Sequence, residues 1–176
     1  LYTVMSRVGL EVTNLTLEPI AAINVAIPPE LRMLNLALVD IGAGTSDIAI
    51  TKNGSVVAYG MVPVAGDEIT EAICQKYLLD FNTAEKIKIS LNTAKADIKF
   101  VDIMGIKQIK TVQEIKEVIR PAVEHIADMV AERIAEYNQK PPNAVFLVGG
   151  GSQIEDLSKL IAEKLRLSEE RVAVRG

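Results

Sequence analysis

Residues 40–47 read Asp-Ile-Gly-Ala-Gly-Thr-Ser-Asp and lie between two apolar segments. Gly42 and Gly44 carry no side chain, so peptide N–H groups in this turn can approach phosphate oxygens closely. Thr45 adds a hydroxyl donor, and Asp40, at the end of an apolar strand, is positioned to hold Mg²⁺ through water. Read alone, the segment also fits a plain glycine hairpin whose polar side chains satisfy only turn hydrogen bonds.

A second glycine cluster, residues 149–151, follows the short apolar run 144–148. Ser152 is expected to cap a helix over residues 152–166, with Glu155 three positions later completing a capping box. Three consecutive glycines let a flat ligand or a phosphate lie directly against the main chain, beside the positive end of a helix. The alternative is a loop packed tightly under a neighbouring helix.

The pattern around the two clusters excludes two common phosphate motifs. No Gly-Lys-Ser/Thr follows a glycine-rich turn, and neither cluster reads Gly-x-Gly-x-x-Gly at the start of a helix. The first cluster leads into another strand and then into Asn53-Gly54, a strong hairpin signal. The first glycine loop is therefore predicted to join antiparallel strands, and the second to join a strand to a helix.

Apolar periodicity predicts an alternation of strands and helices along the whole chain. The most regular segment is a long amphipathic helix over residues 111–137, in which Pro121 predicts a kink or a break. The expected strands are 15–18, 36–41, 46–52, 55–62, 143–149 and 171–174, the expected helices are 19–27, 67–80, 83–93, 111–137 and 152–166, and a hairpin is expected over 97–110.

Five segments, in this order and at these separations, resemble the actin-like ATPases, the superfamily of actin, MreB, the seventy-kilodalton heat-shock chaperones and FtsA. Residues 40–45 resemble its second phosphate loop and residues 147–152 its adenosine loop. Residues 17–22 resemble the segment that links the two lobes. Two further segments, 64–68 and 84–89, fall where the family contacts phosphate, ribose and adenosine. Within the superfamily, residues 8–12, 17–22, 37–42 and 148–155 most resemble FtsA and its bacterial relatives.

The resemblance implies an α/β fold, an actin-like (ribonuclease H-like) ATPase lobe with a mixed central sheet, flanking helices and a smaller outer subdomain. It implies that residues 1–18 are a remnant of the first lobe and the linker between lobes. Residues 19–66 and 111–176 would form the inner ATPase subdomain, and residues 67–110 the outer one. The family's first phosphate loop has no counterpart in these 176 residues, so we expect the second lobe of a longer protein.

The resemblance also implies ATP and Mg²⁺ as cofactors, bound between the two lobes. Glu18 would orient the attacking water, and Asp40 would act beside it and hold the metal through water. The remaining site residues implied by the family are Gly42, Ala43, Gly44 and Thr45 on the phosphates, Gly66 on phosphate or ribose, Glu85 and Lys88 on ribose or base, and Gly149, Gly150, Gly151 and Ser152 around the adenosine.

The function implied by the resemblance is that of the ATP-binding lobe of an FtsA-like ATPase, in bacterial cell division or membrane-associated filament assembly. Its expected partners are adenine nucleotide, the missing first lobe of the same protein, and filament or self-assembly partners. We expect the fragment alone to be inactive in hydrolysis. Two alternatives remain open: the lobe of a chaperone-type allosteric ATPase, and an assembly module that does not depend on nucleotide.

Composition limits the expected partners and the expected cellular compartment. The net charge is −4 with acidic and basic residues interspersed, so we expect no nucleic acid as partner. One cysteine, Cys74, cannot form an internal disulfide, and a reducing cytoplasm fits best. The longest apolar stretch is too short for a membrane segment, although peripheral membrane attachment of the full-length protein stays open. Neither Cys74 nor His125 is expected to take part in chemistry.

Overall fold

The computed structural model of this chain describes residues 1–94 and 96–175. Its centre is a five-stranded sheet in the order β3-β2-β1-β6-β7. The strands are β1 (Leu36–Ile41), β2 (Ser46–Lys52), β3 (Ser55–Val62), β6 (Ala144–Val148) and β7 (Val172–Val174). β1 is antiparallel to β2 and parallel to β6. This mixed sheet confirms the predicted strand pairing: the first glycine loop joins antiparallel strands, and Asn53-Gly54 closes the β2–β3 hairpin.

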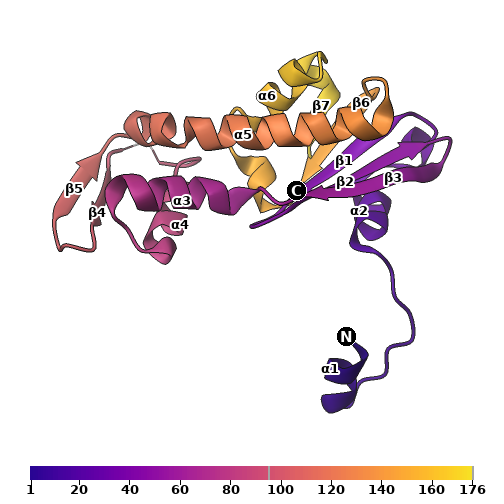
Figure 1. Cartoon of the computed structure of the whole chain (residues 1–176), viewed down its shortest axis with the longest axis horizontal. Helices are drawn as coiled ribbons and strands as arrows, with labels where there is room; N and C mark the ends of the chain where they lie inside the picture. Colours follow the sequence, from indigo (N-terminus) through magenta and orange to yellow (C-terminus); the bar gives the residue numbers. More distant parts are fainter. Residues whose placement is uncertain (95, 176) are drawn as a thin grey trace.

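Helices cover both faces of the sheet (Figure 1). One face packs against α5 (Val112–Asn138) and α6 (Leu157–Lys164), and the other packs against α2 (Glu18–Ala26). The α/β fold class predicted from the sequence is thereby confirmed. Alternate residues of the same strands turn to the two sides: Val39, Ile41, Ile48 and Ile50 join the α5 core, while Leu36, Leu38, Ala49 and Phe146 join Ile23 and Ile27 of α2.

A projecting end of the molecule contains α3 (Gly66–Tyr77), α4 (Phe81–Ser90) and the hairpin of β4 (Ile98–Val101) and β5 (Lys107–Lys110) (Figure 1). The N-terminal part of α5 lies along α3 and ties this end to the sheet. Ile69 of α3 and Ile115 of α5 are fully buried in the same cluster as the sheet residues. The two ends therefore share one continuous hydrophobic core.

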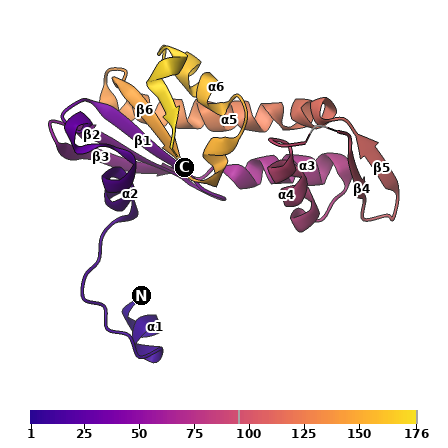
Figure 2. The same ribbon diagram turned by 180° about the vertical axis from the view of Figure 1, so that it is seen from behind.

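The N-terminal arm stands away from the body of the molecule (Figure 2). It consists of α1 (Tyr2–Arg7) and a stretch without regular structure that reaches Leu17. The predicted strand over residues 15–18 is wrong: residues 11–17 have no regular structure, and within residues 1–94 and 96–175 no strand lies beside them to share hydrogen bonds. Glu18 is instead the first residue of α2, and a 3-10 helix, Pro29–Leu31, connects α2 to β1.

The helix predicted over residues 152–166 is confirmed only over α6 (Leu157–Lys164). A separate 3-10 helix, Gly150–Gln153, includes two of the three glycines, so the predicted start at Ser152 is wrong. Asp156 has φ of 65°, a left-handed conformation that separates the two helices. Ser152 consequently caps no helix, and the expected capping box with Glu155 is absent. Of the kink or break expected at Pro121, the break does not occur: α5 continues through Pro121, which lies on the exposed side of the helix.

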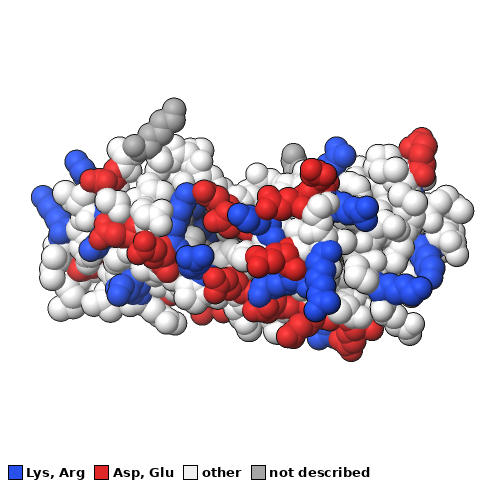
Figure 3. Space-filling model, turned by 90° about the horizontal axis from the view of Figure 1, so that it is seen from above, with Lys and Arg blue, Asp and Glu red and all other residues white. Residues whose placement is uncertain are grey.

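The face formed by α5 and α6 carries both signs of charge, closely intermixed (Figure 3). Ion pairs there join Lys116 to Glu155 and Lys164 to Asp128 across neighbouring elements. Within the described residues, no helix combines the length and the apolar character that crossing a bilayer requires.

Thr111 begins α5 with a complete capping box. Its hydroxyl accepts a hydrogen bond from the Glu114 N–H at 3.1 Å, and the Glu114 carboxylate accepts one from the Thr111 N–H at 2.8 Å. We expect Thr111→Ala to lower the free energy of unfolding by about 1 kcal/mol in urea denaturation. The matched control is Ser168→Ala, because Ser168 precedes the 3-10 helix Glu169–Arg171 without a side-chain capping bond. Equal losses in both variants would contradict the capping assignment.

Candidate functional site

The two glycine loops lie at the same end of the sheet. β1 and β6 are adjacent and parallel, and Asp40 of β1 is in register with Val148 of β6. The first loop leaves the carboxyl end of β1, and the second leaves the carboxyl end of β6. Ligands of open α/β sheets bind outside the carboxyl ends of such strands. The chain thus brings both predicted loops to one position.

The second loop packs directly on the end of β1. Gly149 has φ of +82°, and a Cβ there would collide with the Asp40 carboxylate and the Ile41 carbonyl oxygen. A Cβ on Gly151 would meet the Ile41 side chain. The hydroxyl of Ser152, instead of capping a helix, donates to the Gly149 carbonyl at 2.7 Å. Only glycine at these two positions permits this approach of loop to strand.

The first loop is fixed against the start of α3. The Gly42 N–H donates to the Thr45 carbonyl at 3.0 Å and closes the turn. The first N–H groups of α3 then bind the loop: Gly66 donates to the Gly42 carbonyl at 3.1 Å, and Asp67 donates to the Ala43 carbonyl at 2.8 Å. Residues 42–45 remain exposed. The loop is therefore held from one side and open on the other.

Glu85 and Lys88 of α4 reach the same place. The Lys88 ammonium donates to the Gly66 carbonyl at 3.0 Å and pairs with the Glu85 carboxylate at 2.7 Å. The Thr70 hydroxyl donates to Glu85 at 2.5 Å. Burial acts to raise the pKa of Glu85, but the hydrogen bonds from Lys88 and Thr70 and the Lys88 charge together hold that pKa below its ordinary value. A negative carboxylate is thus maintained beside Gly66.

Carboxylates gather on the face of the sheet that packs against α2. Asp40 and Asp47 are directly opposite each other in the β1–β2 ladder, and Glu18 lines the same narrow crevice. Burial, and next the negative charge of Asp47, raise the pKa of Asp40. Among residues 1–94 and 96–175, no three His, Cys, Asp or Glu side chains form a metal cage. A cation here would complete its shell with water and phosphate oxygens, which is the habit of Mg²⁺.

The sequence motifs predict no role for Asp47. It belongs to β2, two positions after Thr45, and its neighbours Ser46 and Ile48 are buried. The predicted hairpin could have identified Asp47. If the turn is centred on residues 42–45, the antiparallel register places Asp47 opposite Asp40, on the same face of the sheet.

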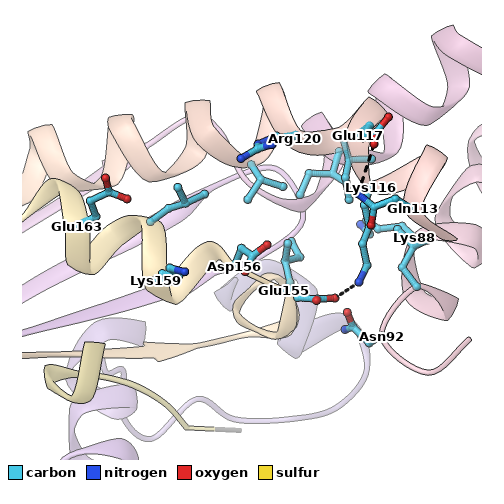
Figure 4. A pocket seen from close by; sticks show the side chains of 16 residues that line it. Lys88, Asn92, Gln113, Lys116, Glu117, Arg120, Glu155, Asp156, Lys159 and Glu163 are labelled. Carbon is cyan, nitrogen blue, oxygen red and sulfur yellow. Dashed lines mark hydrogen bonds and ion pairs between the residues drawn. The ribbon is translucent and has the colours of Figure 1, made fainter. Parts of the chain in front are cut away.

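A cavity of about 430 Å³ lies between α4, α5 and α6 (Figure 4). Its lining mixes charged groups, including Lys88, Lys116 and Glu155, with apolar side chains of α5 and α6. The Asn92 amide donates to the Gln153 carbonyl at 2.9 Å, so the end of α4 is linked to the second glycine loop. The cavity therefore borders the segment 84–89 through Lys88 and begins at Ile154, just beyond the second glycine loop; no sequence motif indicates it.

The sequence profile described as "Cell division protein FtsA" matches residues 37–175. The chain belongs to the FtsA family. The cell division protein FtsA of Bacillus subtilis is 30% identical over an alignment of 171 residues, and the match covers 92% of this chain and 39% of that protein. The cell shape-determining protein Mbl of Bacillus subtilis is 32% identical over an alignment of 154 residues, and the match covers 74% of this chain and 45% of Mbl. The chain thus spans less than half the length of these relatives.

A solved structure confirms the superfamily. MreB5 of Spiroplasma citri, bound to ADP, superposes with a TM-score of 0.71 at 26% identity, and the match covers 99% of this chain and 58% of that one. The resemblance to actin-like ATPases, closest to FtsA, is therefore confirmed together with the fold.

Proposed function

We propose that this chain is the ATP-binding lobe of an FtsA-type, actin-like ATPase, which acts in bacterial cell division or membrane-associated filament assembly. One observation carries the proposal: two glycine loops meet at the carboxyl ends of adjacent parallel strands, with Asp40 between them. The relatives support it, because those at about 30% identity are named for cell division and cell shape, and MreB5 contains ADP.

On this proposal, the exposed turn of Gly42, Ala43, Gly44 and Thr45 binds phosphate oxygens: the Gly42 N–H closes the turn, and the other three residues offer N–H groups and the Thr45 hydroxyl. Asp40, with Asp47 opposite, holds the water shell of Mg²⁺, which would neutralise charge on the transferred phosphoryl group. Glu18 orients the attacking water from the first turn of α2. Transfer of this kind depends mainly on position and charge, and it is suited by a first loop bonded to the start of α3 and by the paired carboxylates of Asp40 and Asp47.

The adenosine lies, on the same proposal, across the bare main chain of Gly149, Gly150 and Gly151. Glu85 accepts hydrogen bonds from the ribose hydroxyls, because its pKa is lowered and it stays ionised. Lys88 contacts ribose or base. Gly66 and Ser152 hold the loops in place, since both are buried and bonded to loop carbonyls. The cavity beside Asn92 and Gln153 leaves room for the edge of the purine.

We further propose that residues 19–66 and 111–176 form the inner subdomain, that residues 67–110 form the outer one, and that residues 1–18 belong to the first lobe and the linker. Large apolar side chains support a covering lobe. Val25 of α2 is 91% exposed, and Leu17 and Leu1 of the arm are 65% and 64% exposed. Leu17 and Val25 lie in the linker and on the helix that a first lobe would contact, so their exposure fits coverage by that lobe.

The test is titration of ATP with matched Mg²⁺ into the full-length protein, together with phosphate release by that protein and by residues 1–176. We expect binding by the full-length protein and negligible turnover by the lobe alone, because the opposing lobe would supply half of the phosphate contacts. Absence of ATP binding would favour the nucleotide-independent assembly module. Equal turnover by the lobe would refute the half-site. A peptide-binding domain in the full-length chain would favour the chaperone-type ATPase.

Lys88→Ala is expected to weaken ATP binding by roughly tenfold, because a charged hydrogen bond to the nucleoside is lost. The fold should persist, since Glu85 keeps its bond from Thr70. Lys99→Ala, at an exposed position in the distant β4–β5 hairpin, is the control and should change neither affinity nor melting temperature. If melting shows that Lys88→Ala unfolds the lobe, the Lys88 stem is a packing element and its adenosine role loses support.

A further inference from the structure

The carboxylate of Asp47 is held by two hydroxyl groups. The Tyr59 phenol donates to Oδ1 at 2.6 Å, and the Thr45 hydroxyl donates to Oδ2 at 3.4 Å. The first bond is short and well within the range for a charged acceptor, whereas the second is long. Tyr59 is therefore the main restraint on the orientation of this carboxylate.

Tyr59 reaches Asp47 from the edge strand of the sheet. In the β2–β3 ladder Tyr59 pairs with Ala49, so it is the diagonal neighbour of Asp47 on the same face. A tyrosine phenol carries its proton at neutral pH, so Tyr59 is the donor in this bond.

Packing does not explain this contact. The Tyr59 side chain is 48% exposed, on the outermost strand of the sheet. An exposed phenol can satisfy its hydroxyl with water, so its bond to a carboxylate is not required for burial. The bond instead restricts Asp47, which stands opposite Asp40 at the turn where the phosphates are proposed to bind.

We propose that Tyr59 is a positioning residue for the metal side of the nucleotide site: its phenol occupies Oδ1 of Asp47 and directs Oδ2 toward Thr45 and the phosphate turn. The inference rests on the proposed function, because it assigns Asp47 to the water shell of Mg²⁺. It goes beyond that proposal by assigning the orientation of that shell to a side chain on β3, outside the glycine loops and the linker.

The test uses Tyr59→Phe in the full-length protein, which removes only the hydroxyl. Affinity for ATP is measured with Mg²⁺ and again with a chelator. We expect the gain in affinity that Mg²⁺ provides to fall about tenfold, as for loss of a hydrogen bond to a charged group, and the affinity without metal to stay unchanged. Tyr137→Phe is the matched control, because its hydroxyl bonds to Arg133 on α5, on the other side of the sheet, and it should alter neither value.

Asp47→Asn tests whether Tyr59 acts through Asp47. In that background, Tyr59→Phe should have no further effect on the Mg²⁺-dependent gain. An unchanged gain in Tyr59→Phe alone, or an equal loss with and without Mg²⁺, would overturn the positioning role while leaving the proposed function intact. Failure of the parent protein to bind ATP under either condition would instead refute the proposed function itself.

Discussion

Asp40→Asn is expected to weaken Mg²⁺-dependent ATP binding by the full-length protein by roughly 10- to 100-fold. The reason is that a carboxylate at the metal's water shell loses its charge while its shape is kept, a loss comparable to that of a charged hydrogen bond. Calorimetric titration with and without Mg²⁺ measures it. His125→Gln is the control, since His125 is exposed on α5, away from both glycine loops. Equal affinities for Asp40→Asn and the parent would remove Asp40 from the site.

The stability of the Asp40→Asn variant is expected to stay the same or rise, although its affinity for ATP falls. Burial and the nearby Asp47 raise the pKa of Asp40 in the folded chain above its unfolded value. The ionised carboxylate therefore costs folding free energy at pH values above the raised pKa, and the cost vanishes below the unfolded pKa of about 3.9. Asp40→Asn removes the cost, so the nucleotide-free protein should melt at the same or a higher temperature at pH 7. A lower melting temperature there would mean that Asp40 has a structural role.

Such an opposition between stability and binding is typical of functional sites. Two carboxylates directly opposite in an antiparallel ladder repel each other, and a strand pair selected only for stability avoids this arrangement. The repulsion between carboxylates in the crevice of Glu18, Asp40 and Asp47 thus lowers the stability of the protein without a cation, whereas the same charges favour binding of a cation. The Asp40→Asn variant measures both effects: stability without nucleotide and affinity for ATP with Mg²⁺.

The features that the sequence predicted correctly are local. Gly42, Gly44 and Asn53-Gly54 specify turns through backbone angles, so the β1–β2–β3 meander followed from residue types alone. The apolar stripe of α5 likewise predicted the helix that covers the sheet, because a helix of 27 residues repeats its period many times.

The features that the sequence did not predict depend on contacts between distant residues. Nothing in the local pattern of β3 indicates that Tyr59 bonds to Asp47, since that contact requires the register of two strands. The cavity beside Asn92 arises where three helices meet. The segment after the second loop looked like a helix start, but Ser152 turns inward to the Gly149 carbonyl and Asp156 adopts positive φ. Tertiary packing there outweighs the capping preference of a serine.

Gly149→Ala is expected to destabilise the lobe by about 3 kcal/mol, the largest loss of stability among the variants considered. Two costs add: a side chain at φ of +82° is strained, and its Cβ would overlap the Asp40 carboxylate and the Ile41 carbonyl oxygen. Neither neighbour can retreat easily, because Ile41 ends the central strand β1 and is fully buried. Urea denaturation of the nucleotide-free protein measures this loss.

Gly150→Ala, one residue along the chain, is the matched control and also distinguishes the two uses of glycine in this loop. A Cβ on Gly150 would meet nothing within 4 Å, and Gly150 does not have positive φ. Stability should therefore change by less than about 0.5 kcal/mol. If adenosine lies against this main chain, however, the added methyl group would fill its place, and ATP affinity should fall without any loss of stability. A normal ATP affinity in Gly150→Ala would indicate that the second loop serves only the packing on β1, whereas a stable Gly149→Ala would contradict that packing.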